Sequence, residues 1–567
     1  MSKLNQLHVL SFFVVGKHED NGIQELGGLV NLHGSLEIKK LENIDDVKEA
    51  KSAKIMDKKH IDELCLEWSS GDDLVSSTQK EKDILDNLQP TNGLKELKIR
   101  GYKGTIFPDW LGKCSYQNMT SVSLVSCKNC CMLPSLGQLP SLKSLYIKGL
   151  DQLRSIGEEF YKNEGDHHSS HIALFPSLET LVFDSMPCWE EWHVPESETF
   201  PQLRNLEITN CPMLKEEMRN QVFFRIVSSL SDVSKVRELH IREHGNLFGP
   251  ADTMNLDGDS LTIRGRESVR ESALKAMMSM NHLSCLQKMD ISGCSSHVSF
   301  PGNCFPKSLQ KLKLCKCSKL EFPQLQQHKY DLVELQIEES CDSLTSLSLD
   351  VFPNLKNLQI YKCRNLESVS MSEAPHAALQ RLIIWGCEKL VSFAGEGLTA
   401  PNLTHLSVTY CKKLEALPRD MKSLLPTLHS LQIYGCLNIC RLAEGGLPPN
   451  LKSLGVGGYD CDNIKSYPEV GSLPHHSSLT TLTIWCFDNL ETLECNELLR
   501  LTSLQQLHIS FCHKLENMEG EKLPPSLLLL KIEGCCLLGE HCKNKHKLIW
   551  PKISHIRTIQ VDSKQIV

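Results

Sequence analysis

The chain has 567 residues, 25 cysteines and a formal net charge of −8 at pH 7, and its isoelectric point is about 6.3. This acidic balance argues against a nucleic-acid-binding protein, which needs a concentrated basic surface. The sequence contains no run near the roughly 18 apolar residues that a membrane-spanning helix needs. The apolar stretch from Leu10 to Val15 is too short for the core of a signal peptide. We therefore expect a cytoplasmic protein with no membrane span and no nucleic-acid partner.

One pattern recurs along most of the chain. It reads Leu-x-x-Leu-x-Ile-x-x-Cys-x-x-Leu and is clearest in the copies that begin at Leu355, Leu379 and Leu403. The alternating aliphatic residues predict a short strand with one buried face, and the Cys that follows is typical of leucine-rich repeats. Between Leu286 and Leu527 the copies recur at about 24 residues, which is within the range for such repeats. We predict an α/β repeat fold, a leucine-rich-repeat solenoid with a curved parallel sheet on its concave face and short helical or irregular convex segments.

The first predicted segment, residues 1–215, contains irregular leucine-rich repeats with wider spacing than those further on. Within it, the apolar spacing of Asp46–Lys59 predicts a helix. Glu81–Leu88, which is followed by Pro90, predicts a second and shorter helix.

The second predicted segment, residues 216–285, is the least periodic part of the chain, and we interpret it as distorted junction repeats. It keeps one clear copy that begins at Val236, and Val269–Met280 reads as a helix. Residues 286–542 form the third segment, the regular C-terminal leucine-rich repeats. We expect residues 543–567 to form a C-terminal cap with a last strand around His555–Val561.

Many of the cysteines occupy one slot of the repeat. The sequence places Cys127, Cys211, Cys294, Cys317, Cys363, Cys387, Cys411, Cys436, Cys512 and Cys535 there. Neighbouring strands lie about 4.7–4.9 Å apart, whereas the Cβ atoms of a disulfide lie about 3.8 Å apart. We therefore predict stacked, buried thiols that hydrogen-bond the turn after the strand, in a reducing compartment.

Aromatic residues recur six or seven positions after the first Leu of a copy. They are Tyr361, Trp385, Tyr410, Tyr434, Trp485 and Phe511. Strand geometry places them in one or two columns along a margin of the concave face, and aromatic residues concentrate at binding hot spots. We predict that these six residues bind a partner. Strands also favour aromatic residues for packing alone, and that alternative stays open.

Candidate metal sites are weak. Cys127 and Cys130 have half of a zinc-site spacing, and Cys535, Cys536, Cys542 and His546 have a suitable composition. Because each Cys also fills a place in the repeat or the cap, we predict no metal site. The sequence contains no nucleophile elbow, no His-Glu-x-x-His motif and no other catalytic pattern. We predict no catalytic residues and no enzyme activity.

Several phrases are more specific than the general repeat. They include Leu64, Leu66 and Trp68, then Gly101–Gly104, Phe107–Trp110, Trp189–Trp192 and the closing Trp550–Ile556. Together they resemble the leucine-rich-repeat region of plant coiled-coil nucleotide-binding leucine-rich-repeat disease-resistance proteins, a family of intracellular immune receptors. The resemblance covers nearly the whole chain.

The resemblance implies a protein-recognition and autoregulatory module of innate immunity. Its N-terminal coils would contact a nucleotide-binding domain, and its C-terminal concave face would bind a pathogen effector or a guarded host protein. The sequence contains no Gly-x-x-x-x-Gly-Lys-Ser/Thr phosphate loop. We therefore expect no cofactor in this chain, since ADP or ATP would belong to the nucleotide-binding domain of longer relatives.

Two other functions are less consistent with the sequence. A ubiquitin-ligase substrate adaptor can carry similar repeats with Cys, but it would need an F-box-like helical segment before the array. A secreted receptor would be expected to have a signal peptide and Asn in the repeat slot. Both fit the sequence less well than the immune receptor.

Overall fold

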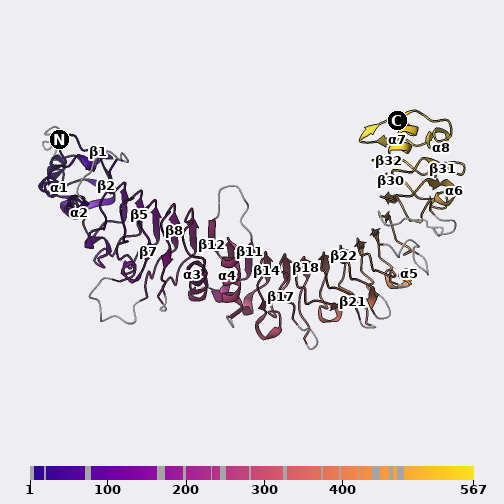
Figure 1. Cartoon of the computed structure of the whole chain (residues 1–567), viewed down its shortest axis with the longest axis horizontal. Coiled ribbons are helices and arrows are strands. Elements are labelled where there is room, and N and C mark those ends of the chain that lie inside the picture. The colour runs from indigo at the N-terminus through magenta and orange to yellow at the C-terminus, as the bar shows by residue number, and fades with distance from the viewer. Residues whose placement is uncertain are drawn as a thin grey trace. The chain divides into compact units, whose positions relative to one another are not determined.

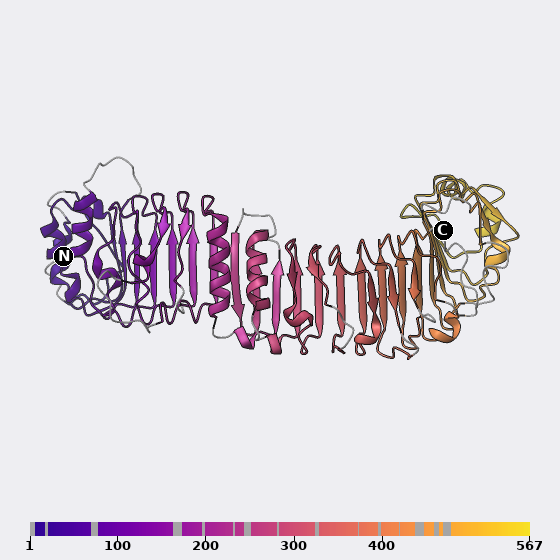
Figure 2. The ribbon, with the colours of Figure 1, turned by 60° about the horizontal axis from the view of Figure 1, so that its bottom comes forward.

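The computed structural model describes residues 6–17, 21–69, 78–162, 173–195, 199–230, 233–242, 251–279, 283–323, 328–371, 374–394, 398–418, 420–436, 447–458, 464–468 and 478–567. The chain divides into two compact units, Met1–Leu286 and Gln287–Val567, which Figures 1 and 2 show in ribbon form. The sequence-based division at residues 215, 285 and 542 stays a prediction.

The first unit is a stack of parallel strands in which each strand pairs with the next coil's strand. These strands are β1 (Phe12–Val14), β2 (His33–Lys39), β3 (His60–Glu67), β4 (Glu96–Arg100), β5 (Ser121–Val125), β6 (Ser144–Lys148), β8 (Thr180–Asp184) and β10 (Asn205–Thr209). On the opposite wall, β7 (Ser155–Ile156) pairs with β9 (Glu191–Trp192).

The helices of this stretch are short. They are α1 (Val47–Ser52) and α2 (Thr78–Asn87), with the 3-10 turns η1 (Ile23–Gly28), η2 (Leu41–Asn43), η3 (Ile55–Asp57), η4 (Asp109–Gly112) and η5 (Glu158–Phe160). The helix expected over 46–59 is interrupted, because Lys54 has a left-handed backbone (φ 49°) between α1 and η3. The helix expected over 81–88 is longer at its start, where α2 begins at Thr78.

The end of the first unit departs from the repeat. Helix α3 (Glu216–Ser229) and η6 (Val233–Lys235) precede β11 (Glu238–Arg242), and then β12 (Ala251–Asp257) runs antiparallel beside β10. The hairpin strand β13 (Ser260–Arg264) lies between β12 and β11. Helix α4 (Glu267–Ser279) and η7 (Leu283–Cys285) follow. The predicted strand at Val236 and helix at 269–280 correspond to β11 and α4, whereas α3, β12 and β13 were not predicted.

The second unit is the regular array. Its parallel strands are β14 (Lys288–Ser292), β16 (Lys311–Cys315), β18 (Glu334–Glu338), β20 (Asn357–Tyr361), β22 (Arg381–Trp385), β24 (His405–Thr409), β25 (Ser430–Tyr434), β26 (Ser453–Gly457), β28 (Thr481–Trp485), β30 (Gln506–Ser510), β32 (Leu529–Glu533) and β33 (Thr558–Val561). The last short strand, β34 (Lys564–Gln565), turns back against β33.

The opposite wall of the second unit consists of short strands and turns. The small sheets are β15 (Val298–Ser299) with β17 (Leu320–Glu321), β19 (Ser346–Ser348) with β21 (Ser368–Ser370) and β23 (Ser392–Ala394), and β27 (Ser466–Tyr467) with β29 (Thr492–Glu494) and β31 (Asn517–Glu519). The helical pieces are η8 (Pro301–Asn303), η9 (Leu349–Val351), α5 (Met421–Leu424), α6 (Cys495–Leu498), α7 (Cys536–Lys543) and α8 (Trp550–Ile553). Among the described residues, none of these or the other helices combines the length and apolar composition needed to cross a bilayer.

The repeat pattern explains why each coil packs on the next. In β20, Leu358 and Ile360 are fully buried, and their neighbours in register, Leu382 and Ile384 of β22, are buried as well. Burying such a side chain contributes about 1.5–3 kcal/mol, so these rows hold successive coils together. This parallel sheet with its short convex segments confirms the predicted leucine-rich-repeat solenoid.

The slot cysteines are buried next to backbone carbonyls. The Cys363 thiol lies 3.8 Å from the carbonyl oxygen of Tyr361 and 3.9 Å from that of Ile337 in the preceding coil. The same thiol lies 3.8 Å from the carbonyl oxygen of Ser340, in the turn after β18, so it contacts both strand carbonyls and the turn that the sequence predicted. No disulfide joins the cysteines of the described ranges.

Candidate functional site

The main sheet of the second unit has one face directed away from the core, which we call the strand face. In β20, for example, Asn357, Gln359 and Tyr361 alternate with the buried Leu358 and Ile360. The first, third and fifth residues of each five-residue strand therefore form this face.

The residue after each strand adopts a left-handed backbone. Lys362 (φ 49°), Gly386 (φ 68°), Tyr410 (φ 54°) and Gly435 (φ 62°) occupy this place in successive coils. The amide of each donates to the last strand residue of the next coil, as from Lys362 to Trp385 at 2.7 Å. We call this row the turn column, and it borders the strand face.

The six predicted aromatic residues fall into two neighbouring columns. Tyr361, Trp385, Tyr434 and Trp485 are fifth residues of β20, β22, β25 and β28. Tyr410 and Phe511 lie in the turn column with positive φ. The structure therefore gathers all six along one margin of the strand face. Their role in partner binding stays a prediction.

Four of these rings touch one another, and we call them the aromatic cluster. Trp385 packs edge-on against Tyr410 with ring centres 5.8 Å apart, and Tyr410 packs edge-on against Trp485 at 6.2 Å. Tyr434 meets Trp485 at 5.6 Å. Burial raises the pKa of Tyr434 to about 12, so its hydroxyl stays protonated. Such pairs contribute about 0.5–1.5 kcal/mol beyond their burial.

The other two predicted residues have different surroundings. The Tyr361 hydroxyl donates to Gln359 Oε1 at 3.1 Å on its own strand. Phe511 is 44% exposed, more than any residue of the aromatic cluster. Phe511 is therefore the ring with the most surface available to a partner.

Glycines in the intervening coil make the aromatic cluster possible. In register, Tyr434 is followed by Gly457 of β26 and then by Trp485. A Cβ on Gly455 would collide with the Tyr434 hydroxyl, and a Cβ on Gly435 would lie 2.7 Å from Tyr410 Cδ1. Trp485 contacts Tyr410, 75 residues earlier in the chain, across coils in which Gly435 and Gly457 carry no side chain.

The strand face beside the cluster carries no charged side chain over several coils. Its outward residues on β24, β25, β26 and β28 are His405, Ser407, Thr409, Ser430, Gln432, Tyr434, Ser453, Gly455, Gly457, Thr481, Thr483 and Trp485. Charged residues stand at the same positions on β16 (Lys311 and Lys313) and β32 (Lys531 and Glu533). We call the small polar region the floor.

A hollow of about 720 Å³ opens at the Trp385 end of the cluster, where Trp385 and Tyr410 meet charged residues. We call it the Trp385 pocket. A second hollow on the strand face, of about 240 Å³, lies over β14 to β20 and has a polar lining that includes the ion pair of Lys311 with Glu334 at 3.1 Å.

The first unit contains two polar networks that are alternative candidate sites. Asp184, at the end of β8, accepts hydrogen bonds from Lys148, Ser185, Thr209 and Asn210 at 2.7–3.0 Å. Burial acts to raise the pKa of Asp184, but these hydrogen bonds outweigh it and hold the pKa at about 2. The carboxylate is therefore fully engaged in joining coils.

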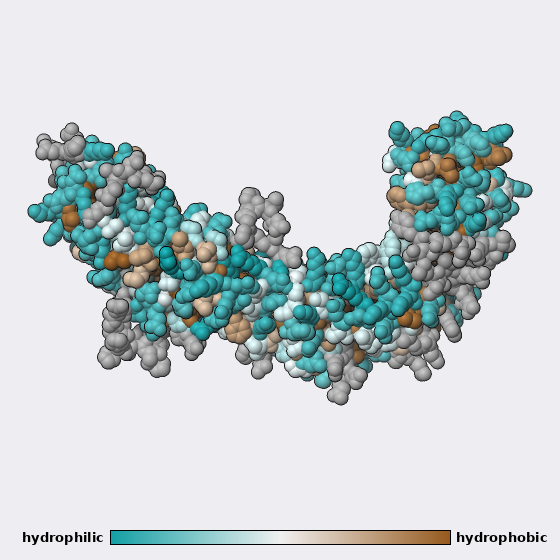
Figure 3. All heavy atoms as spheres, viewed as in Figure 1, coloured by the Kyte–Doolittle hydropathy of each residue, from teal (hydrophilic) through white to brown (hydrophobic). Residues whose placement is uncertain are grey.

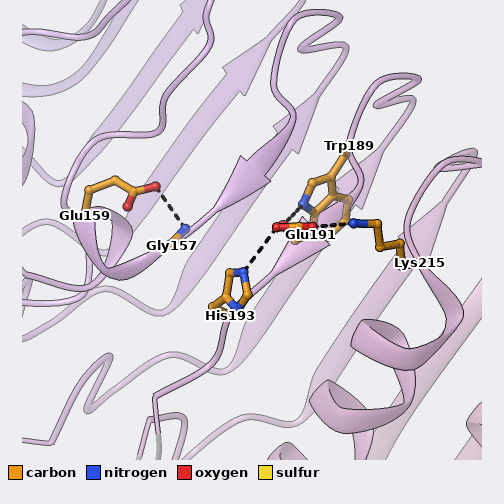
Figure 4. A network of polar contacts seen from close by, with 6 residues as sticks. All are labelled: Gly157, Glu159, Trp189, Glu191, His193 and Lys215. Atoms are coloured by element: carbon orange, nitrogen blue, oxygen red, sulfur yellow. Dashed lines mark hydrogen bonds and ion pairs between the residues drawn. The ribbon is translucent and has the colours of Figure 1, made fainter.

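Figure 4 shows the second network, on the opposite wall. Glu191 accepts from Lys215 and from His193 (3.4 Å), and its carbonyl accepts from Trp189 at 2.9 Å. Hydrogen bonding with Lys215 lowers the pKa of Glu191. Because Lys215 directly precedes α3, this network ties the start of that helix to β9.

Metal-ligand geometry occurs once within the described ranges, where side chains of Glu37, Cys65 and Glu67 approach one another. Arg100 lies within 3.8 Å of both carboxylates, and burial raises the pKa of the Cys65 thiol to about 11. The carboxylates are thus already neutralised and the thiol is protonated. Cys535, Cys536, Cys542 and His546, the larger set considered from the sequence, do not form such a group within the described ranges.

Among the described residues, the exposed large apolar side chains are scattered along the sequence, for example at Val9, Tyr146, Phe224 and Leu548. Figure 3 shows a mainly hydrophilic surface on the side in view, with hydrophobic residues in small groups. A partner would therefore find its apolar contacts at local features such as the aromatic cluster, since most of the surface is polar.

Comparison with known proteins agrees with the repeat fold. The chain is a leucine-rich-repeat protein, and residues 23–150 match the family described as R13L1/DRL21 LRRs. A solved leucine-rich-repeat protein from Leptospira interrogans is 15% identical and covers 95% of this chain and 91% of its own, with a TM-score of 0.19.

The sequence is, more particularly, similar to disease resistance proteins of plants. One from Arabidopsis thaliana is 28% identical over 738 aligned residues, which cover 94% of this chain and 51% of the relative. An RPP13-like protein from the same plant is 33% identical over 54% of this chain and 29% of its own length. These matches confirm the resemblance seen in the sequence. The chain spans about half the length of the first relative and less of the second.

Sequence reasoning found the rings but missed what surrounds them. The glycines at 455 and 457, and the cation of Lys362 that lies 5.2 Å from the Trp385 ring centre, were not noticed. The signal was present, because a strand position occupied by an aromatic residue in one coil and by Gly in the next predicts room for that ring.

Proposed function

We propose that this chain is the protein-recognition and autoregulatory region of a plant disease-resistance receptor, acting in the cytoplasm. The strand face of the second unit would bind a pathogen effector or a guarded host protein. By the same resemblance, coils of the first unit would contact a nucleotide-binding domain, which would carry any ADP or ATP. A non-catalytic role is consistent with the leucine-rich-repeat fold and with the named relatives.

The aromatic cluster beside the floor carries this proposal. Interface hot spots are rich in Trp and Tyr, and they are surrounded by contacts that exclude water. Uncharged floor residues such as Ser407 and Thr483 cost less to desolvate than the charged residues of β16 and β32. Ring contacts within the cluster also fix the side chains before binding, which lowers the entropy lost on association.

A charge placed on the floor tests the proposal. Proteins secreted by pathogens and proteins of the host plant would be screened against the full chain, and the affinity of each binder would be measured by calorimetry. Thr483→Arg should weaken genuine partners at least tenfold, because a long cation would occupy the floor. Ser123→Arg is the matched control, since Ser123 is the third, outward residue of β5 in the first unit.

The screen can also contradict the proposal. Binders that respond equally to the two substitutions would place recognition elsewhere on the chain. Finding no binder among effectors and host proteins would count against a recognition role altogether. Thermal unfolding of both variants, measured by circular dichroism, should match the unsubstituted chain, because both positions face away from the core.

A further inference from the structure

The Trp385 pocket lies where Gly386 leaves the turn column without a side chain. Lys362, Gly386 and Tyr410 follow one another in that column, and all three have positive φ. The neighbouring Lys362 and Tyr410 side chains stand on either side of Gly386, which leaves a hollow of about 720 Å³ with the Trp385 ring as part of its wall. An apolar side chain of a partner could enter there and contact both rings.

Cations around this pocket outnumber carboxylates. Lys362, Arg364, Lys389 and Lys412 line it, against Glu339 and Glu388. The whole chain, by contrast, has a net charge of −8. The pocket is therefore a local basic region on an acidic protein, which favours a partner segment of negative charge.

Contacts within the fold hold two of these cations in place. Lys362 Nζ donates to Glu339 Oε1 at 2.8 Å and lies 5.2 Å from the centre of the Trp385 ring. Lys389 Nζ donates to Asn365 Oδ1 at 2.9 Å, and Asn365 in turn donates to the carbonyl of Asp342 at 2.8 Å. An ammonium group has three donors, so each lysine keeps capacity for a further acceptor.

We propose that the Trp385 pocket binds an acidic segment of a protein that carries an aromatic or large aliphatic side chain. The apolar side chain would lie over Gly386, against the Trp385 and Tyr410 rings. Carboxylates next to it in the segment would pair with Lys389 and Arg364. Glu339 and Glu388 would repel a uniform polyanion such as RNA, because like charges brought together at an interface are unfavourable. This inference rests on the proposed recognition function and specifies the chemistry of its partner.

Synthetic peptides provide the probe. Fluorescein-labelled 12-residue peptides would carry Phe, Leu or Ser at the centre and either Asp or Lys on both sides, and binding to the full chain would be followed by fluorescence anisotropy. The Asp peptides with Phe or Leu should bind at least tenfold more tightly than the Lys peptides and than the Asp peptide with Ser. Raising the salt concentration should weaken the binding of the Asp peptides, since the charge pairs are exposed to solvent.

Two substitutions with matched controls locate the binding. Gly386→Asn fills the hollow with a residue that tolerates positive φ. Gly302→Asn is its control, because it makes the same substitution at a left-handed glycine that has open space around it and lies outside the pocket. Lys389→Glu reverses one pocket charge, and Lys514→Glu reverses a lysine held by the equivalent bond to Asn489 at 2.6 Å. The first member of each pair should reduce peptide affinity about tenfold or more, and the second should not.

Several outcomes would overturn the inference. They are no binding by any Asp peptide, equal binding of the Phe and Ser forms, stronger binding of the Lys peptides, or equal effects of Lys389→Glu and Lys514→Glu. Displacement of the peptide by single-stranded RNA at equal concentration would also count against it. A protein partner that still binds and responds to Thr483→Arg would then leave the proposed function standing without this pocket.

Discussion

Tyr410 and Phe511 lie beside the strand face in an unfavourable backbone conformation. A left-handed conformation costs an L-residue about 1–2 kcal/mol relative to glycine, and both residues adopt it, with φ values of 54° and 56°. Each ring lies against the glycine of the next coil in the turn column, since a Cβ on Gly435 or Gly534 would lie 2.7 or 2.6 Å from the ring. The ring contact offsets the backbone cost only while that glycine is present.

Gly435→Ala should therefore destabilise the chain more than Gly386→Ala. Both glycines have positive φ and would bear the same backbone cost of about 1–2 kcal/mol. The new methyl group at 435 would also displace the Tyr410 ring, whereas at 386 it would lie 3.2 Å from the flexible Lys362 Cγ. Urea unfolding followed by tryptophan fluorescence measures the difference in free energy. Equal losses would mean that the ring contact contributes nothing.

Asp184 should make stability depend on pH in the acid range. Its pKa in the folded chain is about 2, below the ordinary value of 3.8. A depressed carboxyl pKa contributes stability above pH 4, and that contribution is lost as the pH falls from about 4 toward 2. The melting temperature of the unsubstituted chain should exceed that of Asp184→Asn at pH 6, and the gap should narrow at pH 2.5. If the difference in melting temperature stays constant over this pH range, the destabilisation by Asp184→Asn comes from altered shape or hydrogen bonding and not from the carboxylate charge.

At the scale of elements, a buried ion pair holds the antiparallel strand β12 to helix α3. Arg219 of α3 and Asp252 of β12 form a salt bridge with side chains that are 1% and 0% exposed. Arg219 also donates to the carbonyl of Cys211 at 2.9 Å, and Asp252 accepts the amide of Arg266 at 2.9 Å, just before α4. One pair of side chains thus joins two helices, a strand and the preceding coil.

Removing one partner of this ion pair should lower the free energy of unfolding much more than replacing both charged residues with neutral ones. Arg219→Met leaves the Asp252 carboxylate buried without its cation, and breaking such a pair costs about 3–5 kcal/mol. Adding Asp252→Asn removes the stranded charge and keeps an acceptor for the Arg266 amide, so most of the loss should be recovered. Chemical unfolding of the single and double variants provides the comparison. A double variant no more stable than Arg219→Met would mean that the charge itself is not the cause.

These elements also show where sequence reasoning ends. The regular coils were predictable because Leu358, Ile360 and Cys363 recur with one period, and each coil packs only on its neighbours. Strand β12 was not predictable, because its residues carry no repeat pattern and its partner β10 lies some 45 residues earlier in the chain. The aromatic margin followed from the spacing alone. The contact of Trp485 with Tyr410 could not be predicted in this way, because the two residues lie three coils apart.

At the scale of the whole molecule, the second unit offers two neighbouring surfaces of different chemistry to a partner. The uncharged floor lies beside the aromatic cluster, and the basic Trp385 pocket lies at the Trp385 end of the cluster. A partner that covers both would therefore need small polar contacts for the floor and acidic groups for the pocket. The networks of Asp184 and Glu191 in the first unit join coils and leave their carboxylates engaged. Substitutions there should act through stability, whereas those around Trp385 should act on binding.

The turn column also limits how this gene can change length. The Tyr410 ring lies against Gly435 and the Phe511 ring against Gly534, each in the next repeat. Two adjacent repeats therefore have to be inherited together to preserve each contact. Unequal recombination that duplicates or deletes one repeat between such partners would bring a ring against a side chain, or leave a ring without its glycine. Viable length variants should therefore keep each aromatic residue and its following glycine together.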